Sequence, residues 1–166
     1  MNTYILYKTT PIDNLNKHEI YYLNSAILVA EKSLFESNKR LGACIKIQSN
    51  HVITGENQHR ERTGRQYEIS LHAEMNALFK CIKILERKNR FLSNTKKLKN
   101  KIIYVVRLMK LKNNITFPKY YLGNSKPCAN CQRYLWHHNI KKIKYTDIID
   151  GVNVLCEMRR NIYSKL

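Results

Sequence analysis

Hydrophobic and polar positions along the chain follow patterns that predict three helices and five strands. Apolar residues recur at helical spacing in the first segment, and short β-rich runs bounded by turn residues recur later. Their order, α-β-β-α-β-α-β-β, predicts an α/β fold with three layers, α/β/α, around a mixed five-stranded sheet. The helices are expected at 18–38, 71–88 and 127–139, and the strands at 42–47, 52–55, 101–108, 141–145 and 152–156.

Turn signals and apolar runs refine this arrangement. Residues 101–108 are nearly all apolar, which predicts a central strand. Asp150-Gly151 is a strong turn dipeptide, so the last two strands are expected to form an antiparallel hairpin. Residues 1–17 hold one short apolar patch and then Thr10-Pro11, which predicts an N-terminal arm. The expected division is therefore an arm at 1–17, a domain at 18–160 and a tail at 161–166.

Two motifs carry the candidate chemistry: His72-Ala73-Glu74 and Pro127-Cys128-Ala129-Asn130-Cys131. One histidine and two cysteines supply three zinc ligands and leave the fourth tetrahedral position open, as in catalytic zinc sites. Glu74 can reach a metal-bound water without binding the metal, and can move its proton. Each motif is expected at a helix start, where the positive helix end stabilises anions. The alternative is a structural zinc site with Cys81 or Cys156 as fourth ligand.

Together the motifs form the H-x-E…P-C-x-x-C signature of zinc nucleobase deaminases. The chain resembles the cytidine deaminase-like superfamily over roughly residues 20–160, and the segment 72–78, His-Ala-Glu-Met-Asn-Ala-Leu, looks most like deoxycytidylate deaminases. The expected terminal hairpin is more similar to deaminases of free cytidine. The resemblance implies a hydrolytic deaminase of a cytosine nucleotide or nucleoside that releases ammonia. His72, Cys128 and Cys131 would hold Zn²⁺, and Glu74 would be the catalytic proton shuttle.

The same resemblance implies several substrate contacts. Gly42-Ala43 resembles the small pair that lets substrate approach the first strand, and Gly55-Glu56-Asn57 resembles a G-x-N whose Asn57 contacts base or sugar. Ala73 would offer main-chain contacts to the base, and Ser125 would line the mouth of the pocket. The alternative interpretation of Asn57 is an ordinary turn residue after a strand, and we favour the substrate contact.

The charge opens a second interpretation of the substrate. Thirty Lys and Arg against 12 Asp and Glu give a net charge of +18, which attracts polyanions. RNA or single-stranded DNA is therefore an alternative substrate, with basic segments at 96–101, 110–112 and 141–144 as a groove. A catalytically silent nucleic-acid-binding protein is a third possibility. A coding sequence rich in A and T would also favour lysine.

Composition indicates how many domains the chain forms and in which compartment to expect it. The 166 residues, 43% of them hydrophobic, suit one globular domain. No apolar run approaches the roughly 20 residues that span a bilayer, and the N-terminus lacks a secretory signal. Five cysteines, an odd number, fit reduced thiols and a metal site. We therefore expect an intracellular, cytoplasmic protein without a membrane partner, and a homo-oligomer by analogy with similar enzymes.

Overall fold

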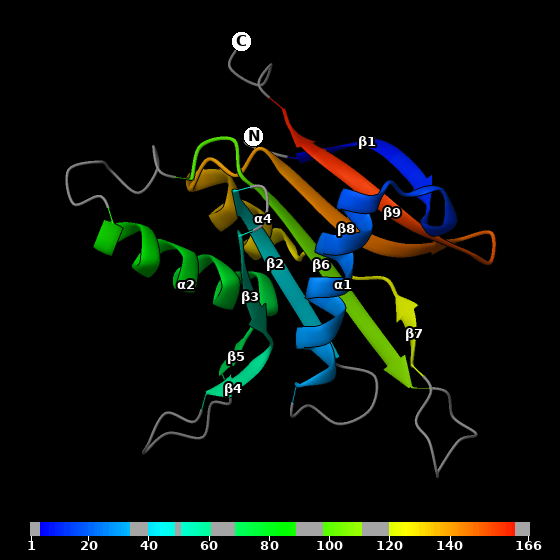
Figure 1. The fold of residues 1–166 in the computed structure, drawn as a ribbon, viewed down its shortest axis with the longest axis horizontal. Coiled ribbons are helices and arrows are strands. Elements are labelled where there is room, and N and C mark those ends of the chain that lie inside the picture. The colour runs from blue at the N-terminus through cyan, green and yellow to red at the C-terminus, as the bar shows by residue number, and fades with distance from the viewer. Residues whose placement is uncertain are drawn as a thin grey trace.

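The structure is a computed structural model that describes residues 4–33, 40–48, 51–60, 69–88, 98–110 and 120–161. These residues form a layer of strands between helices on either side (Figure 1). The helices are α1 (Lys17–Glu31), α2 (Ala73–Lys88) and α4 (Ala129–His137), with a short 3-10 helix η1 (Ile12–Asn14). The strands are β1 (Tyr4–Pro11), β2 (Arg40–Gln48), β3 (His51–Glu56), β4 (Gln58–Arg60), β5 (Ile69–Leu71), β6 (Ile102–Lys110), β7 (Tyr120–Gly123), β8 (Lys142–Ile149) and β9 (Val152–Arg160).

The main sheet has the order β1-β9-β8-β6-β2-β3, and β7 pairs with β6. Strands β6 and β8 are parallel and the other pairs antiparallel, so the sheet is mixed. The three-layer prediction is confirmed, and all five predicted strands are present, with β6 in the interior of the sheet. The sheet has seven strands rather than five, because β7 and β1 add to it.

Strand β1 lies within the segment that the sequence predicts as an arm. It pairs with β9 along its whole length, from Tyr4 beside Arg160 to Pro11 beside Val154. Most of its side chains are exposed, so it lacks the alternation that marks a half-buried strand. Tyr4 anchors it: its hydroxyl donates to Ile140 O at 2.7 Å, and its ring meets Trp136 edge-on.

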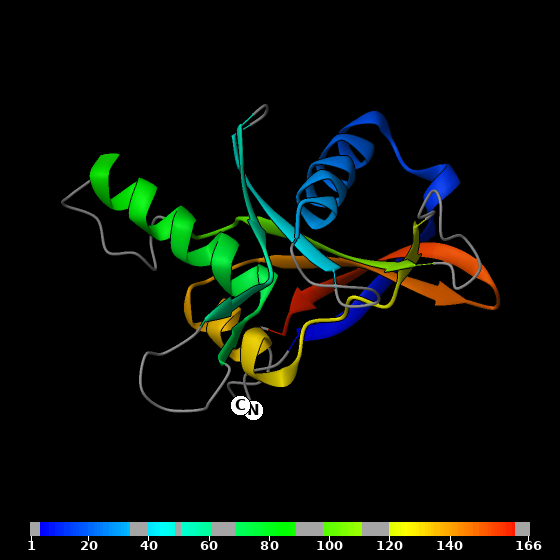
Figure 2. The same ribbon diagram turned by 90° about the horizontal axis from the view of Figure 1, so that it is seen from below.

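Helix α1 covers one face of the sheet, and α2 with α4 cover the other (Figure 2). Small residues allow α1 to approach closely, because a Cβ on Gly42 would lie 2.1 Å from Ala26 O. The buried side of α1 packs on residues of β2 and β6, including Cys44 and Tyr104. Ala43 points to the opposite face and packs in the same core as Ala73 on α2.

Local boundaries differ from the predicted ones where short strands or caps intervene. Helix α2 begins at Ala73 rather than Leu71, because 69–71 pair with 58–60 as a two-stranded ribbon in a region predicted as a loop. Helix α4 begins at Ala129, with Cys128 at its N-cap. The turn between β8 and β9 is confirmed, and Asp150 and Gly151 both have positive φ, 51° and 76°.

Charged side chains fill the junction of α1 with β8 and β9. Lys144 Nζ lies 2.5 Å from Glu19 Oε1 on α1 and 3.3 Å from Glu157 Oε2 on β9. Glu157 also pairs with Lys142 at 3.1 Å and with Arg159 at 2.6 Å. This cluster, Glu19, Lys142, Lys144, Glu157 and Arg159, is called the β8–β9 charge cluster below. Among the described segments, no helix is both long and apolar enough to cross a membrane.

Candidate active site

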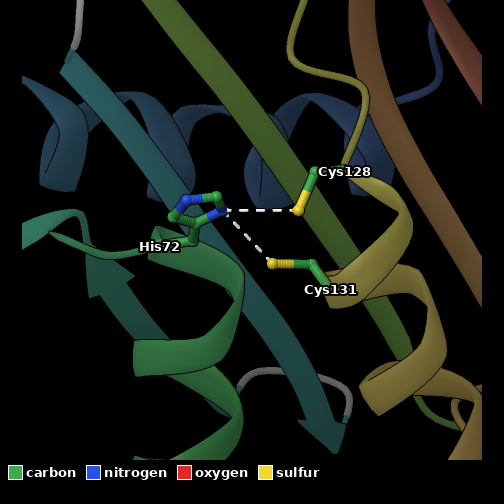
Figure 3. A group of neighbouring side chains, drawn as sticks. All are labelled: His72, Cys128 and Cys131. Atoms are coloured by element: carbon green, nitrogen blue, oxygen red, sulfur yellow. Dashed lines mark hydrogen bonds between the residues drawn. The ribbon is translucent and has the colours of Figure 1, made fainter. Parts of the chain in front are cut away.

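Three candidate ligands meet where two helices begin on the same face of the sheet. His72 lies between β5 and α2, Cys128 is the N-cap of α4, and Cys131 is in the first turn of α4. His72 Nδ1 lies 3.7 Å from Cys128 Sγ and 3.3 Å from Cys131 Sγ (Figure 3). The three ligand atoms all lie within 4.8 Å of one another. The structure thus brings His72 together with two cysteines that lie 56 and 59 positions later in the sequence.

This arrangement fits a tetrahedral zinc ion. Zn–N and Zn–S bonds of about 2.0 and 2.3 Å at the tetrahedral angle separate nitrogen from sulfur by about 3.5 Å. The two observed separations lie on either side of that value. Among the described residues, no fourth His, Cys, Asp or Glu joins the group, and Cys81 is buried in the core. The donor set N, S, S is suited to zinc, and it leaves one position without a protein ligand.

Glu74 lies beside the ligands but is not one of the group. The residue is only 2% exposed, and its Oε1 lies 3.9 Å from His72 Nδ1. Its other oxygen, Oε2, is buried and has no hydrogen-bond partner within the described residues. A buried carboxylate oxygen without a partner is costly. Its cost is offset if the site holds a cation and a bound molecule that can donate a proton.

The electrostatics of Cys131 also fit a metal. Burial raises the pKa of its thiol, and the neighbouring Glu74 carboxylate raises the pKa further. A thiolate there needs a compensating positive charge, which the start of α4 supplies only in part. A bound divalent cation would supply the rest.

The segment that leads to Cys128 is held from both sides. Gln132 Nε2 donates to Pro127 O at 2.7 Å, which ties the loop to α4. Ser125 is 3% exposed, and its hydroxyl donates to Val105 O at 2.7 Å and accepts from Thr146 N at 2.9 Å. These contacts anchor the loop on β6 and β8. The role of Ser125 at the pocket mouth stays a prediction, since every contact described for its hydroxyl is within the protein.

Asn57 follows β3 directly and is 5% exposed. Its Oδ1 accepts hydrogen bonds from Leu41 N and Ser33 Oγ, each at 2.9 Å. The backbone N–H of Asn57 donates to Leu41 O at 3.2 Å. Asn57 is therefore fixed by β2 and by Ser33, which lies just beyond the C-cap of α1. A contact between its amide and a substrate stays a prediction.

The remaining candidates are small residues in tight contacts. Ala73 and Ala43 are fully buried, and Gly42 packs against α1. Ala73 O would lie 2.8 Å from a Cβ on Gly55, so α2 and β3 touch through their backbones. Ala73 lies between the ligand His72 and Glu74. Its main chain is therefore placed at the site, whereas the contacts described for Gly42 and Ala43 are packing contacts.

Asn76 is a buried polar residue next to the site that was not among the predicted site residues. Asn76 on α2 is 5% exposed, and its Nδ2 donates to Glu56 O at 2.8 Å. The signal in the sequence is a polar side chain two residues after Glu74, within an otherwise apolar turn. Its consequences are argued below.

The candidate basic groove is described only in part. Residues 96–97 and 111–119 lie outside the described residues. In the segment 141–144, Lys142 and Lys144 pair with Glu157, and Lys144 is 8% exposed. Lys101 donates to Ile47 O at 2.7 Å. These three lysines therefore make internal contacts.

A known protein family matches this sequence. The sequence model of the cytidine and deoxycytidylate deaminase zinc-binding region matches residues 16–147, which include all three candidate ligands and Glu74. A search of curated protein sequences gave no match.

Two solved structures are similar. One is the dCMP deaminase from the cyanophage S-TIM5 in apo form, with 21% identity, coverage of 82% of this chain and 89% of that chain, and a TM-score of 0.47. The other is the cytidine deaminase from Burkholderia pseudomallei, with 15% identity, coverage of 84% and 91%, and a TM-score of 0.49. Because the family match spans most of the sequence, the chain belongs to the cytidine and deoxycytidylate deaminase zinc-binding family.

Proposed function

We propose that this protein is a zinc-dependent hydrolytic deaminase of a cytosine nucleotide or nucleoside. The observation that carries the proposal is Glu74, whose buried Oε2 has no protein partner in the described structure and which lies next to three zinc-type ligands. A structural zinc site has no use for such a carboxylate, whereas proton transfer requires one.

Each residue then has a defined task. His72, Cys128 and Cys131 would hold the ion, which would lower the pKa of a water molecule in the site toward about 7. Glu74 would accept a proton from the attacking water and deliver it to the ring nitrogen, where it stays. It would then move a second proton, from the newly added hydroxyl, to the departing amine. The exocyclic C–N bond breaks, a carbonyl forms and ammonia leaves. Asn57 and the main chain of Ala73 are our candidates for orienting the base.

The test is ammonia release by zinc-loaded protein from cytidine, deoxycytidine, CMP, dCMP, guanine, adenosine, single-stranded DNA and tRNA. Glu74→Gln keeps the size of the side chain and removes the base, so kcat should fall by about 10²- to 10⁴-fold. Zinc content should stay unchanged. The matched control is Glu86→Gln, an exposed position on the same helix, which should retain activity.

The outcomes separate three classes of protein. Turnover of a free cytosine nucleotide or nucleoside that Glu74→Gln abolishes supports the proposal and names the substrate. Turnover of a polymer alone would replace the substrate with RNA or single-stranded DNA, and its binding would weaken steeply with salt. No turnover by folded, zinc-loaded protein would overturn the proposal in favour of a binding protein.

A further inference from the structure

Asn76 is a buried polar residue to which the proposed reaction assigns no task. It is 5% exposed, and its Nδ2 donates to Glu56 O at 2.8 Å. An asparagine in a helix interior is a weaker helix former than alanine or leucine, and its amide is costly to bury. The stability of α2 therefore does not explain why an asparagine stands at this position.

This contact joins the two parts of the site that come from different elements. On the helix side, Asn76 N donates to His72 O at 2.9 Å, within the turn that carries Glu74. On the strand side, Glu56 ends β3 and is followed directly by Asn57. This side-chain hydrogen bond thus connects the turn of the proton shuttle to the candidate base contact. A second link lies one turn further along α2, where Lys80 Nζ is 3.6 Å from Glu56 Oε2.

The packing next to this contact is backbone against backbone, whereas Ile53 of β3 shares a core with Leu78 and Cys81 of α2 further from the strand end. A Cβ on Gly55 would lie 2.3 Å from Ala77 N and 2.8 Å from Ala73 O, so the two backbones touch without an interlocking side chain. Apolar contact between smooth backbones resists separation more than it resists sliding. A directional hydrogen bond at the same place resists sliding.

We propose that Asn76 is a positioning residue whose hydrogen bond to Glu56 O sets the distance between Glu74 and Asn57. The inference rests on the proposed function, because it assigns both groups to one bound base. A misplacement of about 1 Å can lower the rate of an enzyme by about 100-fold. Losing this bond should therefore lower kcat/KM while the three zinc ligands stay in place.

The experiment compares Asn76→Ala and Asn76→Asp with Asn24→Ala, which removes an exposed asparagine from α1. Asn76→Asp keeps the shape but replaces the donor with an acceptor that faces a carbonyl. Zinc per chain, the melting temperature and kcat/KM well below that temperature are measured for each variant. We expect both Asn76 variants to lose about 10- to 100-fold in kcat/KM with zinc retained, and Asn24→Ala to match the wild type.

A double-variant cycle separates positioning from simple loss of stability. Asn57→Asp keeps an oxygen to accept from Leu41 N and Ser33 Oγ but removes the amide that would meet the base. If Asn76 acts by placing Glu74 against Asn57, Asn76→Ala should cost at most about twofold more in that background. If the double variant instead loses kcat/KM by the product of the factors that Asn76→Ala and Asn57→Asp each cause alone, the inference is overturned.

Three further results would also decide against it. Asn76 variants that melt earlier but keep wild-type kcat/KM would make the residue purely structural. No turnover by the wild-type protein would overturn the proposed function and this inference together. A fully active wild type that Asn76→Asp leaves unchanged would overturn the inference alone.

Discussion

The three candidate ligand residues differ in their exposure to solvent. Cys131 is 4% exposed, whereas Cys128 is exposed and the side chain of His72 is 46% exposed. Cys128 thus lies on the open side of the group, and Cys131 lies against the core. Glu74 is also buried, so it lies with Cys131 on the inner side of the group. Solvent and substrate would therefore reach the group from the side of His72 and Cys128.

Removal of the exposed thiol tests the ligand set directly. Cys128→Ala should reduce bound zinc from about one ion per chain toward zero, because two ligands and one water hold zinc poorly. Zinc per chain is measured by atomic emission after dialysis against a weak chelator. Cys81→Ala, on the buried side of α2, is the matched control and should keep its zinc. Wild-type zinc content in Cys128→Ala would show that another ligand completes the site.

At the scale of elements, two glycines set how closely the helices approach the sheet. Gly42 on β2 meets the backbone of α1, and Gly55 on β3 meets the backbone of α2. The two contacts lie on opposite faces, and only α2 carries candidate catalytic groups. Placement of the site therefore depends on the β3–α2 contact more than on the β2–α1 contact.

Paired alanine substitutions should separate these two contacts. Gly42→Ala and Gly55→Ala each place a methyl group against backbone atoms, so each should destabilise the fold by about 1–3 kcal/mol. Only Gly55→Ala should also lower kcat/KM of the folded protein, because it shifts α2. Denaturant unfolding and steady-state kinetics provide the two measurements. A similar loss of kcat/KM in Gly42→Ala would instead support the predicted approach of substrate to that glycine.

Across the whole molecule, the β8–β9 charge cluster links α1 to the far half of the sheet. Burial alone would raise the pKa of Glu157, but hydrogen bonds from Arg159 and Lys142 and the charge of Lys144 outweigh it. The pKa of Glu157 therefore lies below its ordinary value of 4.5. Its contribution to stability is present above that value and is lost as the pH falls through the lower folded-state pKa.

Glu157→Gln should consequently change the pH dependence of unfolding. At pH 7 the variant should be less stable by about 1–3 kcal/mol, because its lysine and arginine partners lose their counter-charge. Below the folded-state pKa of Glu157 the wild type and the variant should converge. Urea unfolding from pH 7 to about pH 3 measures this, and exposed Glu31→Gln is the control. A difference in unfolding free energy that stays constant from pH 7 to about pH 3 would contradict a lowered pKa of Glu157 in the folded state.

The sequence by itself determined the three helices, five of the seven strands of the main sheet, and the positions of the candidate zinc ligands. Those features are encoded locally: apolar spacing marks the elements, and His72, Glu74, Cys128 and Cys131 sit beside helix-start signals. Their assembly into one group was predictable because each motif had only one partner of matching chemistry.

The tertiary structure alone decided the features that depend on contacts between distant segments. Strand β1 joins the sheet through β9, almost the full chain away, and its exposed side chains give no periodic signal. The hydroxyl of Ser125 makes hydrogen bonds with β6 and β8, and no local sequence pattern predicts these partners. Asn76 reaches Glu56 across the helix–strand contact that Gly55 permits. Hydrogen-bond partners of this kind are set by packing in three dimensions, because the same donor could be satisfied by water or by many other acceptors.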